Sequence, residues 1–274
     1  MSQRARFLLV LPALALAACG DGATGPTEDA IPTLNADVAE AVADGVGEDV
    51  ATMRELNFGL RTGLLFLPVG SFEGRSCPWN SSSGWHQCAS REHGPFTIVR
   101  RYAFYDADGT AQETYDASMT ASIRVQRVVD GSIERETDAG SITGDLHHAR
   151  DLTVSGLAGA ETQRIWNGTG QSDISRTRVN DNRGSRSYEL SVDVEIDDVV
   201  VPHPRNDDQD PWPLSGTITK HVEGSVTVNG ETRSFERTVV VTFDGTQFAK
   251  ATVTGSTVSG EFTIDLANRR LRRP

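Results

Sequence analysis

The sequence predicts an all-β protein, in which a curved, antiparallel and mostly hairpin-connected sheet forms a half-closed barrel or a sandwich, preceded by one amphipathic helix. Apolar and polar residues alternate through several segments of about ten residues, which is the pattern of half-buried strands. Dipeptides typical of tight turns, such as Asn229-Gly230 and Asp244-Gly245, separate these segments. Strands of this length leave long edges, and a curved sheet protects its edges better than a flat one.

The helix is expected over residues 34–57, where apolar side chains recur every three or four residues and form one stripe. The stripe consists of Val38, Val42, Val46, Val50 and Met53. Asn35 is expected to cap the N-terminus of this helix. Gly45 and Gly47 each cost about 1 kcal/mol relative to alanine, so two short helices are an alternative to a single one. We expect the stripe to dock on the sheet; the alternative, a partner-binding or membrane-surface role, fits less well because the polar face is acidic.

The first half of the sheet is expected to begin with a short apolar strand over residues 63–69 and to continue with an alternating strand over residues 96–104. Asp106 to Gly109 has the composition of a tight turn. The alternating residues 119–129 predict another strand, which we expect to end in a hairpin turn at Asp130-Gly131. A two-residue turn would set Val125 opposite Glu136, and a three-residue loop, which we prefer, would set Val129 opposite Ile133.

Residues 143–182 are dominated by Gly, Ser, Thr, Asn and Asp, and only short strands over residues 152–154 and 162–166 are expected there. The following segment, Tyr188 to Asp197, alternates without a fault and predicts a strand with one acidic, water-facing side. Four prolines in residues 201–213 then indicate a long connection between two parts of the sheet.

The C-terminal hairpin is the best-specified element. A two-residue turn at Asn229-Gly230 sets every apolar side chain of both strands on one face. The cross-strand pairs that this register predicts are Val228 with Glu231, Ile218 with Val241, Val222 with Arg237, Gly224 with Phe235, and Gly216 with Phe243. If the sheet holds an apolar cavity, the same face should line it, with Ile218, Val222, Val239, Val241 and Phe243.

The N-terminus carries a short basic region with Arg4 and Arg6, and an apolar run over residues 7–18 follows it. This run is shorter than the roughly 20 residues that a membrane-spanning helix needs, and its layout is that of a secretory signal. The box Leu16-Ala17-Ala18-Cys19 resembles the lipobox of bacterial lipoprotein precursors. An ordinary secretory signal with a chance cysteine is the alternative.

The resemblance implies that Cys19 is acylated, that the leader is removed before it, and that the chain is anchored to a membrane through this lipid. Because Gly20 rather than an aspartate follows the cysteine, the resemblance favours the outer membrane over the inner membrane. The expected organisation is a signal peptide over residues 1–18, a flexible tether over 19–33, the helix over 34–57 and the β domain over 58–274.

An exported protein folds in an oxidising compartment, where an even number of remaining cysteines predicts a disulfide. Cys77 and Cys88 are therefore expected to form a bridge that closes a short, serine-rich loop. A zinc site with His86 or His93 is the alternative, but no second close cysteine pair supports it, and no metal is predicted.

Trp79 and Trp85 are candidate ligand-stacking residues on this loop, since indole rings stack on sugars and apolar ligands. The alternative is that they pack against the end of the sheet. His147 and His148 cannot share a metal on a strand, because their side chains point to opposite faces, and a solvated strand end is the expected setting. Asp207, Asp208 and Asp210 could hold calcium, but an acidic, proline-rich loop is favoured.

The chain has 38 acidic and 26 basic residues, and its formal net charge of −12 disfavours nucleic acid as a partner. No serine-hydrolase elbow, phosphate-binding loop, His-Glu-x-x-His motif or dinucleotide fingerprint occurs in it. We therefore expect a non-catalytic protein without a cofactor that binds an apolar ligand, a glycan or a partner protein. A structural envelope component with no small-molecule ligand is the alternative, and a hydrolase is the least favoured. A wide apolar cavity between helix and sheet favours ligand binding, and a filled core favours the structural role.

Overall fold

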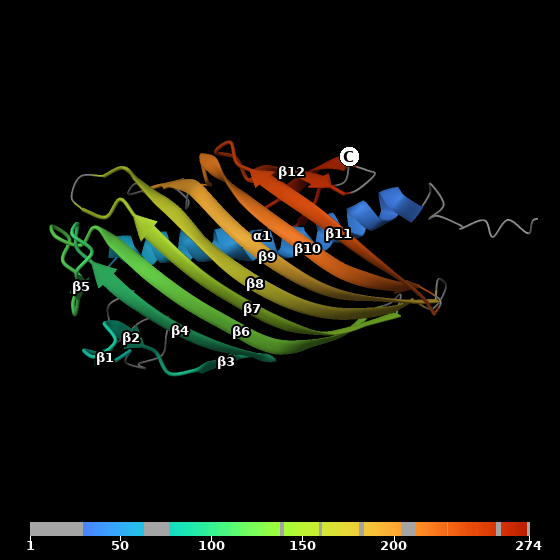
Figure 1. The fold of residues 1–274 in the computed structure, drawn as a ribbon, viewed down its shortest axis with the longest axis horizontal. Helices are drawn as coiled ribbons and strands as arrows, with labels where there is room; N and C mark the ends of the chain where they lie inside the picture. Colours follow the sequence, from blue (N-terminus) through green and yellow to red (C-terminus); the bar gives the residue numbers. More distant parts are fainter. Residues whose placement is uncertain are drawn as a thin grey trace, which may run out of the picture.

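The computed structural model describes residues 30–62, 77–137, 140–158, 161–180, 184–203, 212–228, 230–255 and 259–272. This part of the chain forms one helix, α1 (Ala30–Thr62), and one sheet of 14 strands (Figure 1). The strands are β1 (Trp79–Asn80), β2 (Trp85–Gln87), β3 (Arg91–His93), β4 (Phe96–Tyr105), β5 (Ala111–Gln112), β6 (Ser122–Thr137), β7 (Gly140–Ser155), β8 (Gln163–Asn180), β9 (Gly184–Pro202), β10 (Ser215–Val228), β11 (Glu231–Thr242), β12 (Phe248–Thr254), β13 (Ser259–Asp265) and β14 (Arg270–Leu271).

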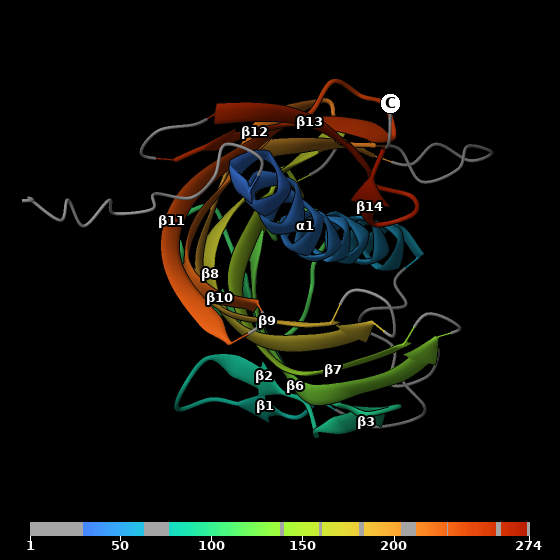
Figure 2. The same ribbon diagram turned by 90° about the vertical axis from the view of Figure 1, so that its right-hand side faces the viewer.

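The sheet is antiparallel throughout and, from β6 onward, each strand pairs with the next one in the chain. Its order is β1-β2-β4-β6-β7-β8-β9-β10-β11-β12-β13-β14, and β3 and β5 pair with β4. Figure 2 shows this sheet curling around α1 as an open gutter, and β1 and β14 at its two ends do not pair with each other. The predicted antiparallel, hairpin-connected, half-closed fold is confirmed. The predicted leader, the tether up to residue 29 and the expected strand over residues 63–69 lie outside the described residues.

Helix α1 lies on the concave side of the sheet and is closest to β12, β13 and β14 (Figure 2). Its apolar stripe is buried, with Val46 and Met53 at 0% exposed. The helix extends beyond the expected residues 34–57 at both ends. The acidic polar face is consistent with this docking, because only the stripe has to leave water.

Gly45 and Gly47 do not break the helix. A Cβ atom at Gly45 would lie 2.8 Å from Lys220 Nζ, and one at Gly47 would lie 2.6 Å from the side chain of Arg269. The two glycines therefore let side chains of β10 and of the β13–β14 turn approach the helix backbone. Their cost in helix propensity is offset by this close packing, which local sequence does not reveal.

The prediction that Asn35 caps the helix is wrong. The helix already begins at Ala30, and Asn35 is 2% exposed inside it. Its Oδ1 accepts a hydrogen bond of 2.8 Å from Nε of Arg237, which is itself buried on β11. This bond ties the first half of α1 to the sheet and satisfies the guanidinium there.

The C-terminal hairpin has the predicted register over its whole ladder. Gly230, with φ of 86°, lies in the turn. Val241 is fully buried and Thr242 is exposed, as the assignment of faces requires. The confirmed pairs are Val228 with Glu231, Ile218 with Val241, Val222 with Arg237, and Gly224 with Phe235.

The fifth predicted pair of this hairpin, Gly216 with Phe243, is not part of the ladder. The ladder ends at Thr217 and Thr242, and the pairing with β9 shifts at the same place. Gly216 has φ of 99°, and a Cβ there would lie 2.3 Å from the carbonyl oxygen of Asp198. A bulge thus takes the place of the expected pair.

The predicted hairpin turn at Asp130-Gly131 is wrong, because β6 continues through both residues to Thr137. Gly131 is needed for another reason. A Cβ there would lie 2.5 Å from the carbonyl oxygen of Pro95 and from the ring of Phe96 on the neighbouring β4. A glycine in a strand can mark such a close approach as well as a turn.

The weakly patterned residues 143–182 form two of the longest strands, β7 with 16 residues and β8 with 18. β7 pairs along its length with both neighbours, and β8 pairs with β7 and, apart from a bulge at Asn167, with β9. The strands therefore form although their apolar alternation is interrupted. The concave positions that lack an aliphatic side chain are Gly144, His148, Arg150, Gly168, Gly170, Ser172, Arg176 and Arg178. Because the side chains that face the helix are largely polar or absent, these residues show little alternation. The sequence therefore predicted only short strands here.

Candidate functional site

A cavity of about 930 Å³ lies between α1 and the concave face of the sheet. On the sheet, apolar side chains of β4, β6, β8 and β9 line it, among them Ile98, Val129 and Ile174. On the helix, Val38 and Val42 face it. Pockets that bind small molecules typically enclose about 300–1,000 Å³. The cavity exists because α1 lies toward the β12–β14 end of the gutter, which leaves the space over β6–β9 less filled.

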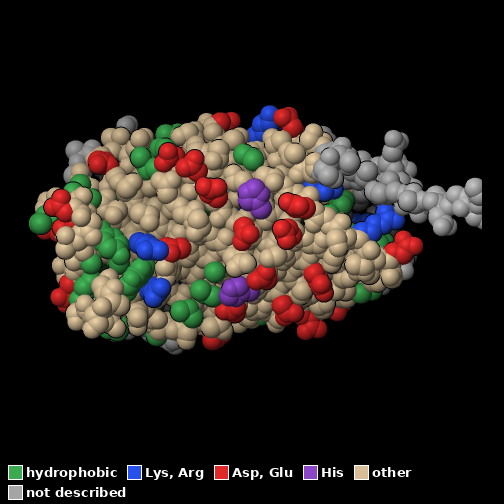
Figure 3. Space-filling view, in the orientation of Figure 1, with side chains coloured by type: hydrophobic (Ala, Val, Ile, Leu, Met, Phe, Trp, Pro, Cys, Tyr) green, Lys and Arg blue, Asp and Glu red, His purple; other side chains and the backbone are tan. Residues whose placement is uncertain are grey.

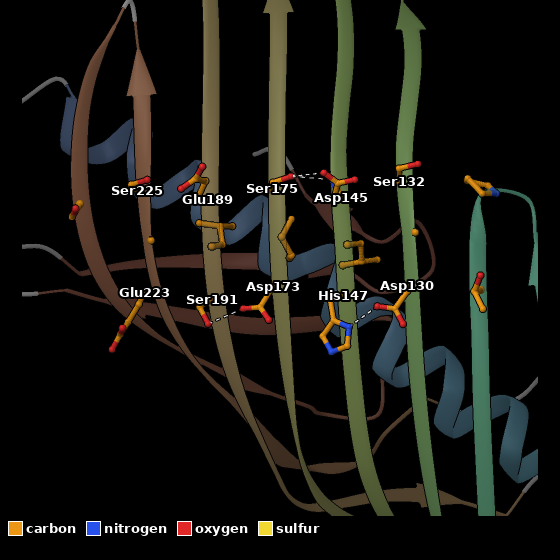
Figure 4. Close-up of a pocket in the computed structure, with 18 residues that line it drawn as sticks. Asp130, Ser132, Asp145, His147, Asp173, Ser175, Glu189, Ser191, Glu223 and Ser225 are labelled. Atoms are coloured by element: carbon orange, nitrogen blue, oxygen red, sulfur yellow. Dashed lines mark hydrogen bonds and ion pairs between the residues drawn. The ribbon is translucent and has the colours of Figure 1, made fainter. Parts of the chain in front are cut away.

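Among the described residues that line this cavity, cationic residues outnumber acidic ones, although acidic residues outnumber basic ones in the whole chain. The acidic residues in the described lining are Glu48 and Asp145. The carboxylate of Asp145 interacts with Ser175 on the outer face of the sheet (Figure 4). The cationic residues in this described lining are Arg127, Arg176, Arg178, Arg186, Lys220 and Arg269.

A buried polar cluster centred on Asp49 of α1 borders the cavity. Its Oδ1 accepts a hydrogen bond of 2.7 Å from Nε of Arg150, and its Oδ2 accepts one of 3.2 Å from Nζ of Lys220. The side chains of all three are at most 3% exposed. The hydroxyl of Ser172 lies 2.9 Å from His148 Nδ1, while His148 Nε2 lies 3.7 Å from Asp49 Oδ1 and has no hydrogen-bond partner among the described residues.

The charges of this cluster shift its titrations. Burial alone would raise the pKa of Asp49, but the charges of Lys220 and Arg150 outweigh it and hold that pKa well below its ordinary value. Burial lowers the pKa of Lys220 and of His148, against the opposing attraction of Asp49. His148 is therefore neutral at pH 7, and one carboxylate faces two cationic side chains.

A second ion pair joins the helix to the sheet at the cavity wall. Arg127 Nη1 of β6 donates to Glu48 Oε1 at 2.9 Å and to the hydroxyl of Thr52 at 3.2 Å. Both charged side chains remain about one-quarter exposed. This pair spans the space between α1 and β6, where the helix makes little other contact with the sheet.

The outer face of the sheet carries a second hollow, of about 1050 Å³, of opposite character (Figure 4). Carboxylates and serines cross it in two rows, with α1 behind the strands. The first row is Ser132, Asp145, Ser175, Glu189 and Ser225, and the second is Asp130, His147, Asp173, Ser191 and Glu223. In the space-filling view, acidic side chains are scattered over this outer face and Lys and Arg are few (Figure 3).

The acids of the outer hollow interact with their neighbours across the strands. Asp130 Oδ1 lies 2.6 Å from His147 Nδ1, and Asp173 Oδ1 accepts a hydrogen bond from Ser191. No group of three His, Cys, Asp or Glu side chains among the described residues is placed to hold a metal ion. His147 and His148 lie in the middle of β7 and point to opposite faces, which confirms the predicted orientation of their side chains. The expected setting at a solvated strand end is wrong for His148, which is buried.

The predicted disulfide is present, and Cys77 and Cys88 are joined with a Cα–Cα distance of 4.0 Å. His86 lies against this bridge, but its ring nitrogens face the carbonyl oxygens of Cys77 and Glu113, at 3.0 Å and 2.8 Å. The bridge and these contacts hold the short β1–β2 hairpin on β4.

The two candidate stacking residues lie on opposite faces of the β1–β2 hairpin, because Trp79 is opposite His86 and Trp85 follows on the other side. The ring of Trp79 tilts against His86 at 5.1 Å. Trp85 is 9% exposed and lies beneath the guanidinium of Arg101 at 4.7 Å. The two rings therefore cannot sandwich one ligand, and the geometry favours the packing alternative.

The sequence predicted the correct face for a cavity but the wrong strands. Of the five residues expected to line it, only Val222 does so. The other four, Ile218, Val239, Val241 and Phe243, are buried in the core that packs around α1. The helix covers the most apolar strands, so the open volume lies over strands that the sequence marks as weakly patterned.

Sequence reasoning missed the Asp49 cluster, although a signal was present. Lys220 stands in the apolar phase of its strand, between Ile218 and Val222, and Asp49 stands beside Val50 in the helix. A charged residue at a core position requires a buried partner. The sequence does not reveal that Lys220 and Asp49 contact each other in the folded protein. The remaining predicted positions, Cys19 and Asp207 to Asp210, lie outside the described residues.

Within the described part of the chain, no helix has the length and apolarity needed to cross a membrane. Comparisons of the chain with protein-family models, with curated proteins and with solved structures each found no match. The residues of the cavity and of the buried cluster are thus the basis for a functional argument.

Proposed function

We propose that this chain is a non-catalytic envelope lipoprotein that binds an apolar or amphipathic small molecule in the cavity between α1 and the sheet. The observation that carries this proposal is the volume of about 930 Å³ beside the apolar stripe of the helix. A chain with a purely structural role has no need for such a space, because filling it with side chains would stabilise the fold.

The apolar middle of the cavity supports an apolar portion in the ligand. Ile174 and Leu190 pair across β8 and β9, and Val129 and Val222 lie one row further along the same face. Burying the alkyl surface of a ligand against these side chains contributes about 25 cal/mol per Å² of apolar area. A glycan would leave this surface without a partner, which makes it the less suitable ligand.

Lipid anchoring is the second part of the proposal and rests on the Leu16-Ala17-Ala18-Cys19 box. Two or more acyl chains at Cys19 would hold the protein stably on a bilayer, and the outer membrane is the proposed location. Metabolic labelling with a fatty acid should mark the wild-type protein and leave Cys19→Ala unlabelled. Equal labelling of the two proteins would contradict the anchor, and fractionation of the two membranes tests the location.

Ligand binding is tested with a neutral, solvatochromic apolar dye and the full chain carrying Cys19→Ala, so that the protein's own acyl chains cannot compete. The dye should bind saturably and with a blue-shifted emission. Ile174→Trp fills the cavity from β8 and should weaken dye binding about tenfold.

Gln171→Trp is the matched control, because Gln171 lies on the same strand but is exposed on the outer face. This variant should bind the dye like the parent protein. Dye binding that is absent from the parent, or that is lost equally in both tryptophan variants, would contradict the cavity as the binding site and would favour a structural role.

A further inference from the structure

Three arginines and a tyrosine form a block on the concave face at one end of the cavity, called the arginine block below. Arg176 and Arg178 lie two residues apart on β8, and Arg186 and Tyr188 lie opposite them on β9, with Arg178 paired to Arg186 and Arg176 to Tyr188. Nη1 of Arg186 donates a hydrogen bond of 3.1 Å to the hydroxyl of Tyr188. All four residues line the cavity.

This arrangement of charges is electrostatically unfavourable. Like charges placed directly opposite each other on neighbouring strands are destabilising. No described side chain forms a hydrogen bond or ion pair with Arg176 or Arg178, whereas other arginines of the sheet are paired, such as Arg124 with Asp151 and Arg127 with Glu48. Acidic residues exceed basic ones in this chain by 38 to 26, so a shortage of carboxylates does not explain the lack of partners.

The opposite end of the cavity has a different electrostatic character. There Lys220 and Arg150 already share the carboxylate of Asp49. Between the two ends lies the apolar pair of Ile174 and Leu190. Arg176 and Ser172 are four residues apart on β8, and at the rise per residue of a strand this separates them by about 13 Å. The cavity therefore offers an apolar stretch that ends in a group of arginines, of which Arg176 and Arg178 have no partner among the described side chains.

We infer that the ligand of this cavity is an amphiphile with an anionic head group, a phosphate or a carboxylate, and that Arg176, Arg178 and Arg186 bind that head group. This inference rests on the proposed function, since it names the chemical class of the ligand for the same cavity. The guanidinium fork matches the oxygens of a carboxylate or phosphate in two parallel hydrogen bonds. An anion between Arg178 and Arg186 turns their mutual repulsion into attraction. The alkyl chain then lies along Ile174 and Leu190 toward the helix.

The test compares ligands that differ only in the head group. Calorimetric titration of the full chain carrying Cys19→Ala, with monomeric dodecyl phosphate, dodecanoate and dodecanol, should give the two anions an affinity about tenfold or more above that of the alcohol. Arg176→Gln combined with Arg178→Gln should abolish this preference and leave dodecanol binding unchanged. Lys250→Gln is the charge control, because Lys250 is an exposed cation that pairs with Glu261 on the outer face.

The outcomes separate the inference from the proposed function. Equal affinity of the parent protein for all three ligands would overturn the anionic head group while leaving the cavity as an apolar site. Failure of all three to bind would overturn the proposed function as well. Inorganic phosphate that binds as tightly as dodecyl phosphate would show a simple anion site and contradict an amphiphile. Equal losses in the arginine double variant and in Lys250→Gln would assign the effect to net charge rather than to the block.

Discussion

The two halves of the concave face carry out different tasks with the same backbone architecture. On β10 to β12 most inward positions near the helix are aliphatic and fully buried, as at Ile218, Val241 and Val253. The exceptions Lys220 and Arg237 are buried against polar side chains of α1. On β7 and β8 the corresponding positions hold His148, Arg150 and several glycines, and two of them, Gly144 and His148, line the cavity. Both halves are long antiparallel ladders, so backbone pairing alone does not distinguish them.

This difference indicates that stability and binding are divided between the halves. The half formed by β10 to β12, which we call the dry half, buries the apolar stripe of α1 and excludes water. The half that includes β7 and β8, which we call the open half, holds cationic side chains and the volume of the cavity. A protein selected only for stability would have packed aliphatic side chains there. The Asp49 cluster lies at the border between them and joins the helix to both.

The largest expected effect is at this border. Asp49→Ala leaves Lys220 and Arg150 buried without their carboxylate, and it should lower the free energy of unfolding by about 3–5 kcal/mol. Glu48→Ala, at the preceding residue, removes a partly exposed pair with Arg127 and should cost about 1 kcal/mol or less. Urea unfolding measures both, and equal losses would contradict a buried border cluster.

A matched pair of truncations compares the two halves directly. Ile218→Ala opens a void in the dry half and should cost about 2–5 kcal/mol. Ile174→Ala removes a half-buried side chain that already borders open volume, so it should cost about 1 kcal/mol or less. If the two truncations cost the same in urea unfolding, the distinction between a packed and an open half is wrong.

The smallest expected effect is a pH dependence from His148. Burial lowers the pKa of His148, so below its unfolded value of about 6.5 the unfolded chain binds a proton that the folded chain does not. The free energy of unfolding should therefore fall as the pH decreases from about 7 to 5, by at most about 1.4 kcal/mol per pH unit. The pKa of Asp49 is lowered well below its ordinary value, so the stability that this group provides is lost only at more acidic pH.

His148→Gln should flatten the profile of stability between pH 7 and 5. His147→Gln should leave the slope in place, because His147 lies exposed on the outer face, whereas His148 is buried. A profile that is flat in the parent protein, or a slope that persists in His148→Gln, would contradict this assignment.

Sequence patterns were most informative in the dry half. Alternation and turn chemistry at Asn229-Gly230 predicted the C-terminal register, and its ladder pairs from Val228 to Ile218 are confirmed. Sequence patterns led to wrong predictions where one residue type can serve two structural purposes. Gly131 indicated a turn but allows close approach of β4, and Asn35 indicated a helix cap but binds the buried Arg237.

What the sequence by itself determined about this protein is the direction in which each well-patterned strand faces, the register of the last hairpin and the pairing of Cys77 with Cys88. These features depend on residues that are close in the chain, since side chains alternate with a period of two and a tight turn sets its own register. Only the tertiary structure decided where the cavity lies and which charges meet. Asp49 reaches Arg150 and Lys220 across 101 and 171 residues of chain. No local pattern encodes such distances, and the cavity exists because α1 lies over β12–β14 and leaves β6–β9 less covered.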